Sequence, residues 1–413
     1  MVQNYDNHGI LKNRRVNNPN LVPNLVTQVT RPDTISSGMT KPGSVIEFVS
    51  STTGSTQLTV GVGDSIQDAI NKVNSLGGGI VNLQNGFHSV QNDIFLYSNV
   101  TLQGQNALST IIDFGGKNYS IKIWGTSLYS TGTIAINAGS ITVTGSGTAW
   151  TSALNGYSII IQGVYYTIAS VNSTTSITIA ETFIGTNVSG IVYSIDEPIS
   201  DTKISTISIQ NSLGNGIDIR NSDIAIIDTI GVFSCGTGIY INYIDAAIIT
   251  QAEIIGCGYG ANLNNAGSLS FTTFFINYTS TGYGISLNSV FSSTILDWSA
   301  SGCAGDGMAL TNCWQIDLFS GNTNSCTGNG VNMISGNLEI VHVSTSSFRN
   351  TGNGIIISSN SNYCNLIGCQ FDNNGAWGIN VGSGCTGNVL NGNTYVGNTS
   401  GTYTNSGTST RIF

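Results

Sequence analysis

Apolar residues alternate with polar ones in short segments that recur at a constant spacing through the second half of the chain. Each segment opens with Gly-x-Gly, as in Gly214-Asn-Gly-Ile-Asp-Ile219. Alternation with a period of two predicts a half-buried strand. The second glycines of successive segments are 22 to 24 residues apart. They are Gly216, Gly238, Gly260, Gly284, Gly307, Gly330, Gly354 and Gly378.

Each repeat contains three apolar groups. In the first repeat they are Ile217 with Ile219, Ile224 with Ile226, and Ile230 with Phe233. A step of about 23 residues with three short strands predicts one coil of an all-β parallel β-helix per repeat, with three sheets around a dry core. We expect the glycines to supply a positive φ where the chain turns between sheets.

Other residue types recur at fixed places in the repeat. Cys235, Cys257, Cys303 and Cys326 share one register, which Asn350 and Asn374 continue. This register favours a packed stack of free, buried thiols, with a disulfide between neighbouring coils as the alternative. A second register predicts a ladder of turn residues whose amides hydrogen-bond between coils. Its members are Asn221, Asn242, Asn265, Asn288, Asn312, Ser335, Ser359 and Ser383.

One amphipathic helix is expected ahead of the repeats, over Asp64–Leu76. Ile66, Ala69, Ile70, Val73 and Leu76 share one face. Ser65 and Asp68 form a capping box, and three glycines at 77–79 end the helix. Such a helix covers the open core end of a β-helix. Residues 56–130 are therefore predicted to hold this helix and the first coils.

The 23-residue spacing stops between residues 131 and 195. Alternating strands with turn signals between them replace it, which predicts a small all-β module inserted in the β-helix. Residues 196–413 form the main coils and the C-terminal end in this division. Residues 1–55 show no period and are interpreted as an arm or attachment segment.

The composition narrows the possible functions. Only 8% of the 413 residues are charged, 52 are glycine, and the net charge is −9, which excludes a typical soluble enzyme with a charged helical surface. The basic residues cluster only at Lys12, Arg14 and Arg15, so no nucleic-acid partner is expected. No stretch of 18 apolar residues occurs, so no membrane insertion is expected.

The first thirty residues contain no apolar segment of signal-peptide length. The composition nevertheless resembles that of extracellular proteins. A virion component, assembled inside the host and released by lysis, reconciles these two observations. A bacterial surface adhesin is a third interpretation, but it needs an export signal.

Two stretches resemble known proteins. Ile-Gln-Asp-Ala-Ile at 66–70, Gly-Gly-Gly-Ile-Val-Asn-Leu at 77–83 and Ser-Asn-Val-Thr-Leu-Gln-Gly at 98–104 resemble the opening of pectate-lyase-like right-handed β-helix proteins, which include pectinases and bacteriophage tailspikes. The strands around Ser140–Trp150 and Tyr166–Ile179 resemble a β module of phage tail proteins. The resemblance implies a right-handed β-helix and covers roughly residues 60–400.

The enzyme motifs of that family are missing. Arg220 and Arg349 are the only arginines among the repeats, and neither neighbours an acidic cluster of the kind that pectate lyases use for calcium. The motifs Asn-Thr-Asp, Asp-Asp, His-Gly and Arg-Ile-Lys of polygalacturonases are also absent. The cysteines and three histidines show no metal-binding spacing, so no cofactor and no metal site are expected.

A carboxylate pair is the candidate for catalysis. Asp317 and Glu339 each lie between apolar residues, so alternation is expected to place both outward on the same strand, one coil apart and about 5 Å from each other. Retaining glycosidases hold their two carboxyl groups ~5–5.5 Å apart. The alternative is two solvated charges on an outer face. Asp223 and Asp245 also share a register, and we interpret them as solvated turn residues.

Three tryptophans are candidates for glycan binding. Trp298 and Trp314 fall near apolar offsets, so core packing competes with sugar stacking, and Trp377 replaces a polar residue within a glycine turn, where exposure is expected. His342 is isolated and is interpreted as structural.

The sequence therefore predicts a virion tail fibre or tailspike subunit that binds a host surface polysaccharide. We expect a homotrimer attached to other tail or baseplate proteins through residues 1–55. The alternative is a polysaccharide depolymerase on the same scaffold, acting through Asp317 and Glu339.

Overall fold

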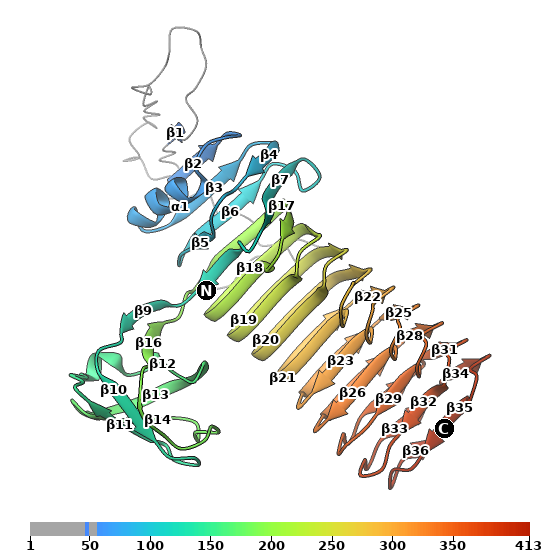
Figure 1. Ribbon diagram of the computed structural model, residues 1–413. Coiled ribbons are helices and arrows are strands. Elements are labelled where there is room, and N and C mark those ends of the chain that lie inside the picture. Colours follow the sequence, from blue (N-terminus) through green and yellow to red (C-terminus); the bar gives the residue numbers. More distant parts are fainter. Residues whose placement is uncertain (1–45, 49–55) are drawn as a thin grey trace, which may run out of the picture.

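The computed structural model describes residues 46–48 and 56–413. The predicted arm, residues 1–55, lies outside the described residues except for strand β1 (Ile46–Phe48), which pairs antiparallel with β2 (Thr56–Val60). The remaining residues form a right-handed parallel β-helix, one short helix at its start and a separate antiparallel module (Figure 1). The predicted fold class is confirmed.

The β-helix contains the 28-stranded sheet. Its first coils use β2, β3 (Gly79–Leu83), β4 (Gly86–Ser89), β5 (Ile94–Leu96), β6 (Val100–Gly104), β7 (Thr110–Lys117) and β8 (Ile121–Trp124). In the next coils the strands run together as β17 (Thr202–Ser212), β18 (Asn215–Phe233), β19 (Thr237–Ile255), β20 (Tyr259–Asn277) and β21 (Ile285–Leu296).

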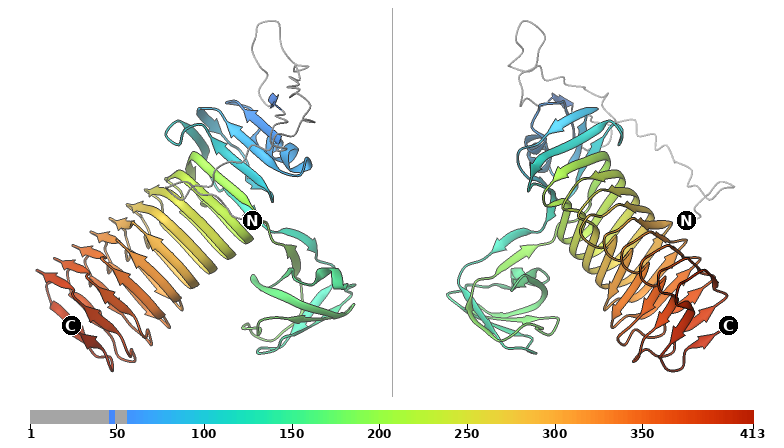
Figure 2. Two further views of the ribbon diagram at one scale, coloured as in Figure 1. Left: turned by 180° about the vertical axis from the view of Figure 1, so that it is seen from behind. Right: turned by 45° about the vertical axis from the view of Figure 1, so that its right-hand side comes forward.

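From there on, each coil contains three separate strands, as predicted (Figures 1 and 2). They are β22 (Trp298–Ser301), β23 (Met308–Thr311), β24 (Trp314–Phe319), β25 (Asn322–Asn324), β26 (Val331–Ser335), β27 (Leu338–Val343), β28 (Ser346–Phe348), β29 (Ile355–Ile357), β30 (Asn365–Ile367), β31 (Gln370–Asp372), β32 (Trp377–Val381), β33 (Val389–Asn391), β34 (Thr394–Val396), β35 (Gly401–Asn405) and β36 (Arg411–Ile412).

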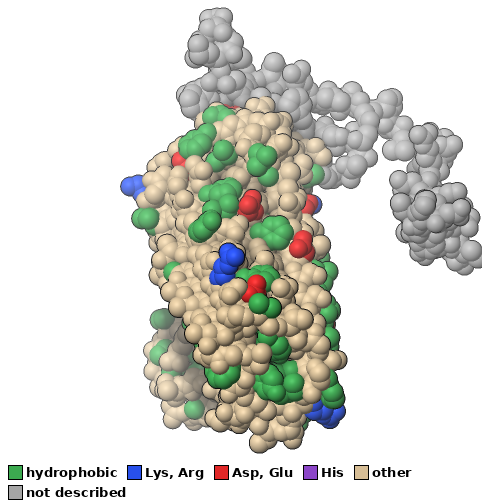
Figure 3. Space-filling view, turned by 90° about the vertical axis from the view of Figure 1, so that its right-hand side faces the viewer, with side chains coloured by type: hydrophobic (Ala, Val, Ile, Leu, Met, Phe, Trp, Pro, Cys, Tyr) green, Lys and Arg blue, Asp and Glu red, His purple; other side chains and the backbone are tan. Residues whose placement is uncertain are grey.

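Stacked apolar side chains fill the core. Ile217 pairs with Ile239, which pairs with Ala261, and the same register continues through Ile285, Met308, Val331, Ile355 and Ile379. All of these residues are buried. Few charged side chains appear on the face of the molecule shown in Figure 3, which agrees with the low charge content of the sequence.

The repeat glycines are needed for a different reason from the one predicted. None of the second glycines has a positive φ. Instead, a Cβ at Gly238 would lie 2.7 Å from the carbonyl oxygen of Gly260, and a Cβ at Gly260 would lie 2.3 Å from that of Gly284. Each coil thus approaches the next so closely that only glycine fits.

The cysteine stack packs inside the β-helix as predicted. All eight cysteines of the chain are buried and unpaired. Burial raises the pKa of the Cys364 thiol to about 12. The backbone N–H of Cys326 donates to Asn350 Oδ1 at 3.0 Å, and Asn350 Nδ2 donates to Asn374 Oδ1 at 3.1 Å. A buried amide ladder therefore continues the register of the thiols.

The one α-helix of the described residues, α1 (Ile66–Ser75), lies at the N-terminal end of the β-helix (Figure 1). The Ser65 side chain caps it by accepting a hydrogen bond from the Asp68 backbone N–H at 3.2 Å. Ile66, Ala69, Ile70 and Val73 are buried against the first strands. Leu76 was expected on the same face, but it follows the last helical residue and is 51% exposed.

The inserted module is an eight-stranded antiparallel sheet. Its strands are β9 (Thr126–Tyr129), β10 (Thr133–Ile136), β11 (Thr142–Ser146), β12 (Ser158–Ile161), β13 (Val164–Ser173), β14 (Ser176–Ile179), β15 (Val188–Ile191) and β16 (Ser194–Glu197). It has its own core around Trp150, whose Nε1–H donates to the Tyr193 hydroxyl at 2.8 Å. Strands β9 and β16 lead out of the β-helix and back, so the module replaces part of a single coil (Figure 1).

His342 lies in the core, in register with Leu318 on one side and Leu366 on the other. Its Nδ1 lies 3.3 Å from Thr345 Oγ1, and its Nε2 has no partner. Burial lowers the pKa of His342 to about 3. The folded protein therefore keeps the ring neutral, whereas the unfolded chain takes up a proton below pH ~6.5.

We expect His342→Leu to make the protein more resistant to acid. In the wild type this residue removes about 1.4 kcal/mol of stability for each pH unit below ~6.5, down to the folded pKa. Leucine fits the ladder between Leu318 and Leu366 and does not titrate. Urea unfolding at pH 7 and at pH 5 measures the effect. Parallel loss of stability in the variant and the wild type would contradict this assignment.

Candidate functional site

A groove of about 710 Å³ lies between the inserted module and the β-helix. The module contributes residues of β12 and β13, and the β-helix contributes the turns that follow the first strand of successive coils. The two parts meet where Ser158 Oγ donates to Asn221 Oδ1 at 2.9 Å and where the Tyr165 and Tyr243 ring centroids are 4.5 Å apart. The groove thus depends on the insertion being docked against the coils.

The floor of the groove is the ladder of turn residues. Residues with left-handed backbone conformation line it in successive coils, with φ between 47° and 59°. They are Asn221, Tyr243, Asn265, Ser289 and Asn312. The sequence placed Asn242 and Asn288 in this ladder, but in those two coils the next residue makes the turn. Asparagine tolerates this conformation well because its short polar side chain bonds locally.

Aromatic rings form the walls. Trp314 and Phe291 are each 49% exposed and line the groove with Tyr165 and Tyr243. Burial raises the pKa of Tyr165 and of Tyr243 to about 12, so both hydroxyls are protonated hydrogen-bond donors at neutral pH. Rings combined with a few amides and hydroxyls are the usual lining of small-molecule sites.

Two carboxylates stack within the groove. The neighbours of Asp223 pair in parallel register with those of Asp245, Ser222 with Ile244 and Ile224 with Ala246. Asp223 and Asp245 therefore lie opposite each other on adjacent strands, which are ~4.8 Å apart. Asp223 accepts a hydrogen bond from Ser200 Oγ at 2.6 Å. Partial burial, and then the charge of Asp223, raise the pKa of Asp245.

The sequence had favoured Asp317 and Glu339 over this pair. They face a shallow hollow of about 430 Å³ beside the groove, but they are not directly opposite each other as expected. Asp317 pairs in register with Val341. Glu339 has a φ of 56° and lies beside Gln315, which has a φ of 54°. These paired left-handed residues shift the register that simple alternation predicts.

Glu339 instead organises the end of the groove. Its Oε2 accepts hydrogen bonds from Trp314 Nε1 and from Gln315 Nε2, each at 3.2 Å. The Trp314 ring lines the groove, so Glu339 orients that ring and links the groove to the adjoining hollow.

The three predicted sugar-binding tryptophans have different positions. Only Trp314 lines the groove. Trp298 is 1% exposed, so it packs in the core and has no face free for a sugar. Trp377 was expected to be exposed, but it is half-buried, with its ring against Gly401. Sequence alone could not separate these rings because all three follow the same repeat.

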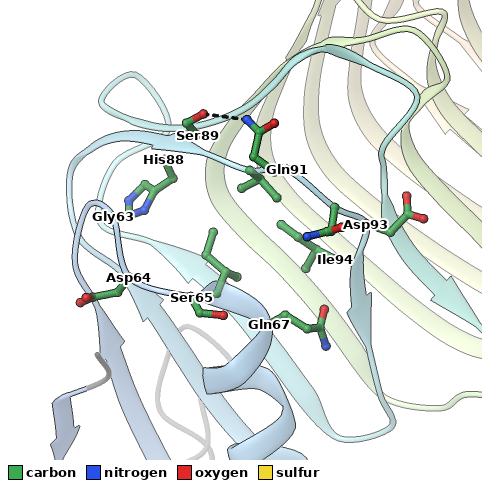
Figure 4. A pocket seen from close by; sticks show the side chains of 12 residues that line it. Gly63, Asp64, Ser65, Gln67, His88, Ser89, Gln91, Asp93 and Ile94 are labelled. Atoms are coloured by element: carbon green, nitrogen blue, oxygen red, sulfur yellow. Dashed lines mark hydrogen bonds between the residues drawn. The ribbon is translucent and has the colours of Figure 1, made fainter. Parts of the chain in front are cut away.

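A smaller hollow of about 260 Å³ lies beside the start of α1 (Figure 4). The polar groups on it are mostly engaged within the protein. Asp93 forms an ion pair with Lys122 at 2.7 Å, and His88 Nε2 contacts the carbonyl oxygen of Gln84 at 2.8 Å. No wall of exposed aromatic rings lines it, so the larger groove is the better candidate.

Residues 46–48 and 56–413 contain no group of three or more His, Cys, Asp or Glu side chains that could hold a metal ion. Within the same ranges, no helix is sufficiently long and apolar to cross a membrane.

No family model and no curated protein sequence matches the chain. Solved structures do match. The catalytic unit of an α-1,3-glucanase from Streptomyces thermodiastaticus aligns with a TM-score of 0.53 at 10% identity, covering 84% of this chain and 63% of that one. A DFA-IIIase from Arthrobacter chlorophenolicus, solved with DFA-III, aligns with a TM-score of 0.50 at 12% identity over 80% of each chain. The chain shares their β-helix fold.

A tailspike of Pseudomonas phage phi297 also matches, with a TM-score of 0.44 and 12% identity, over 81% of this chain and 68% of that one. The fold thus occurs in phage tailspikes and in carbohydrate-active enzymes. At this identity the fold is what the proteins have in common, so substrate and role must be argued from the groove itself.

Proposed function

We propose that the protein is a tail fibre or tailspike subunit of a virion and that it binds a host cell-surface glycan in the groove beside the inserted module. The observation that carries the proposal is the row of exposed rings over a floor of amides and hydroxyls. Ring faces cover the apolar faces of sugars, and amides exchange hydrogen bonds with sugar hydroxyls. The resemblance of residues 66–104 and of the module to phage tail proteins supports the virion assignment.

Trp314→Ala and Tyr243→Ala should each weaken glycan binding on the order of tenfold, because each removes a ring face from the groove. Retention of the protein on immobilised host polysaccharides measures the effect. Tyr278→Ala is the matched control, since this ring is 67% exposed but lies outside the groove. Equal losses in all three variants would rule out the groove as the binding site.

We also propose that the subunit forms a homotrimer and attaches to other tail or baseplate proteins through residues 1–55. Light scattering on the full chain should give three times the mass of one chain, 43.2 kDa, and an unheated sample should resist SDS. A monomeric mass would contradict the assembly.

A polysaccharide depolymerase is the second candidate function. The stack of Asp223 on Asp245 favours it, because the ~4.8 Å strand spacing approaches the ~5–5.5 Å separation of carboxyl groups in retaining glycosidases. In this proposal Asp245, whose pKa is raised, donates a proton to the glycosidic oxygen. Asp223, held by Ser200, is the nucleophile. Asp317 and Glu339 remain an alternative pair in the adjoining hollow.

A further inference from the structure

The groove and the adjoining hollow carry charge of one sign only. Glu181, Asp223 and Asp245 line the groove, and Asp317 and Glu339 line the hollow. Of the described residues that line either one, none is Lys, Arg or His. A ligand that occupies this surface therefore faces five carboxylates and no opposing cation.

The guanidinium of Arg220, close to the module, does not offset this charge. Its Nε and Nη2 donate to the two carboxylate oxygens of Asp218 at 2.7 and 2.9 Å. The rings of Trp124 and Tyr240 lie 4.7 and 5.1 Å from it. Because a carboxylate takes its hydrogen-bonding edge and two rings lie against it, its charge is neutralised within the protein.

Building on the proposed glycan-binding function, we propose that this groove selects glycans of uncharged or amine-bearing sugars and excludes acidic ones, such as polymers rich in uronic or sialic acid. A sugar carboxylate stacked on Trp314 or Tyr243 would enter the field of Asp223 and Asp245 without a counter-ion. A sugar ammonium in the same place would instead donate hydrogen bonds to these carboxylates. Like-charge repulsion over ~5 Å in water changes an affinity about fourfold per carboxylate, before screening by salt.

A matched pair of polymers tests the selection. First, purified capsular and O-antigen polysaccharides of neutral, amine-bearing and acidic classes are screened by biolayer interferometry at low salt. The tightest neutral ligand is then oxidised at its primary hydroxyls, which converts part of its sugars to uronic acids on the same backbone. We expect the wild type to bind the oxidised polymer at least tenfold more weakly than the parent, and added salt to reduce this ratio.

The triple variant Glu181→Gln, Asp223→Asn, Asp245→Asn should bring the ratio of oxidised to parent binding close to one, because it removes the charge and keeps the shape. Glu253→Gln, which removes an exposed carboxylate outside the groove, should leave the ratio as in the wild type. Preferred binding of an acidic polymer, or an unchanged ratio in the triple variant, would overturn the inference alone. A wild-type protein that retains no polymer of any class would overturn the proposed function together with it.

Discussion

Asp223→Asn and Asp245→Asn should each lower the rate of polysaccharide cleavage at least 100-fold, if measured on a polymer that the wild type depolymerises. General acid and base groups contribute 10²–10⁴ to such rates, and the two residues are stacked in one groove with the pKa of Asp245 raised. Asparagine keeps the size of the side chain but neither donates the proton nor attacks the sugar. Reducing-end release from the bound polymer measures the rate.

Binding of the same variants to the polymer, measured separately, distinguishes lost chemistry from lost affinity. Asp317→Asn and Glu339→Gln are the matched comparison, because they change the second pair of carboxylates beside the same groove. Cleavage that survives in the Asp223/Asp245 double variant but disappears in the second pair would transfer the catalytic role to the adjoining hollow. A wild type that binds and never cleaves would leave the receptor-binding function and remove the depolymerase.

The spacing of the glycines was sufficient to predict the coils, because a β-helix imposes one structural period on the whole chain. The three strands per coil and the buried register of Cys326 and Asn350 followed from the same arithmetic. The reason for the glycines did not follow. A close approach between coils and a positive φ both select glycine, and only coordinates distinguish them.

The site was harder to predict for two physical reasons. Alternation assumes an unbroken strand, whereas the left-handed residues Gln315 and Glu339 move the outward positions and separate Asp317 from its expected partner. The docking of the module against the coils is also a contact between distant segments. Nothing near Tyr165 in the sequence reveals that its ring meets Tyr243. The shared register of Asp223 and Asp245 was the signal that pointed to the groove.

Gly330→Ala should destabilise the β-helix by about 3 kcal/mol, at the upper end of the cost of overpacking a core. A Cβ at this position would lie 2.1 Å from Ser347 Oγ, 2.4 Å from Thr323 Oγ1 and 2.5 Å from the carbonyl oxygen of Gly354. The two hydroxyls form a buried hydrogen bond of 2.9 Å, which Asn350 extends. The methyl group would therefore separate neighbouring coils and break a buried polar network at once.

Gly382→Ala is the control for this prediction. It has no positive φ, and its added Cβ would come no closer than 3.3 Å to another atom, the carbonyl oxygen of Ile357. We expect it to change the stability by less than about 1 kcal/mol. Urea unfolding followed by circular dichroism compares both variants with the wild type. Equal stability of the two variants would show that the coils relax to admit a side chain and that close approach does not explain the repeated glycines.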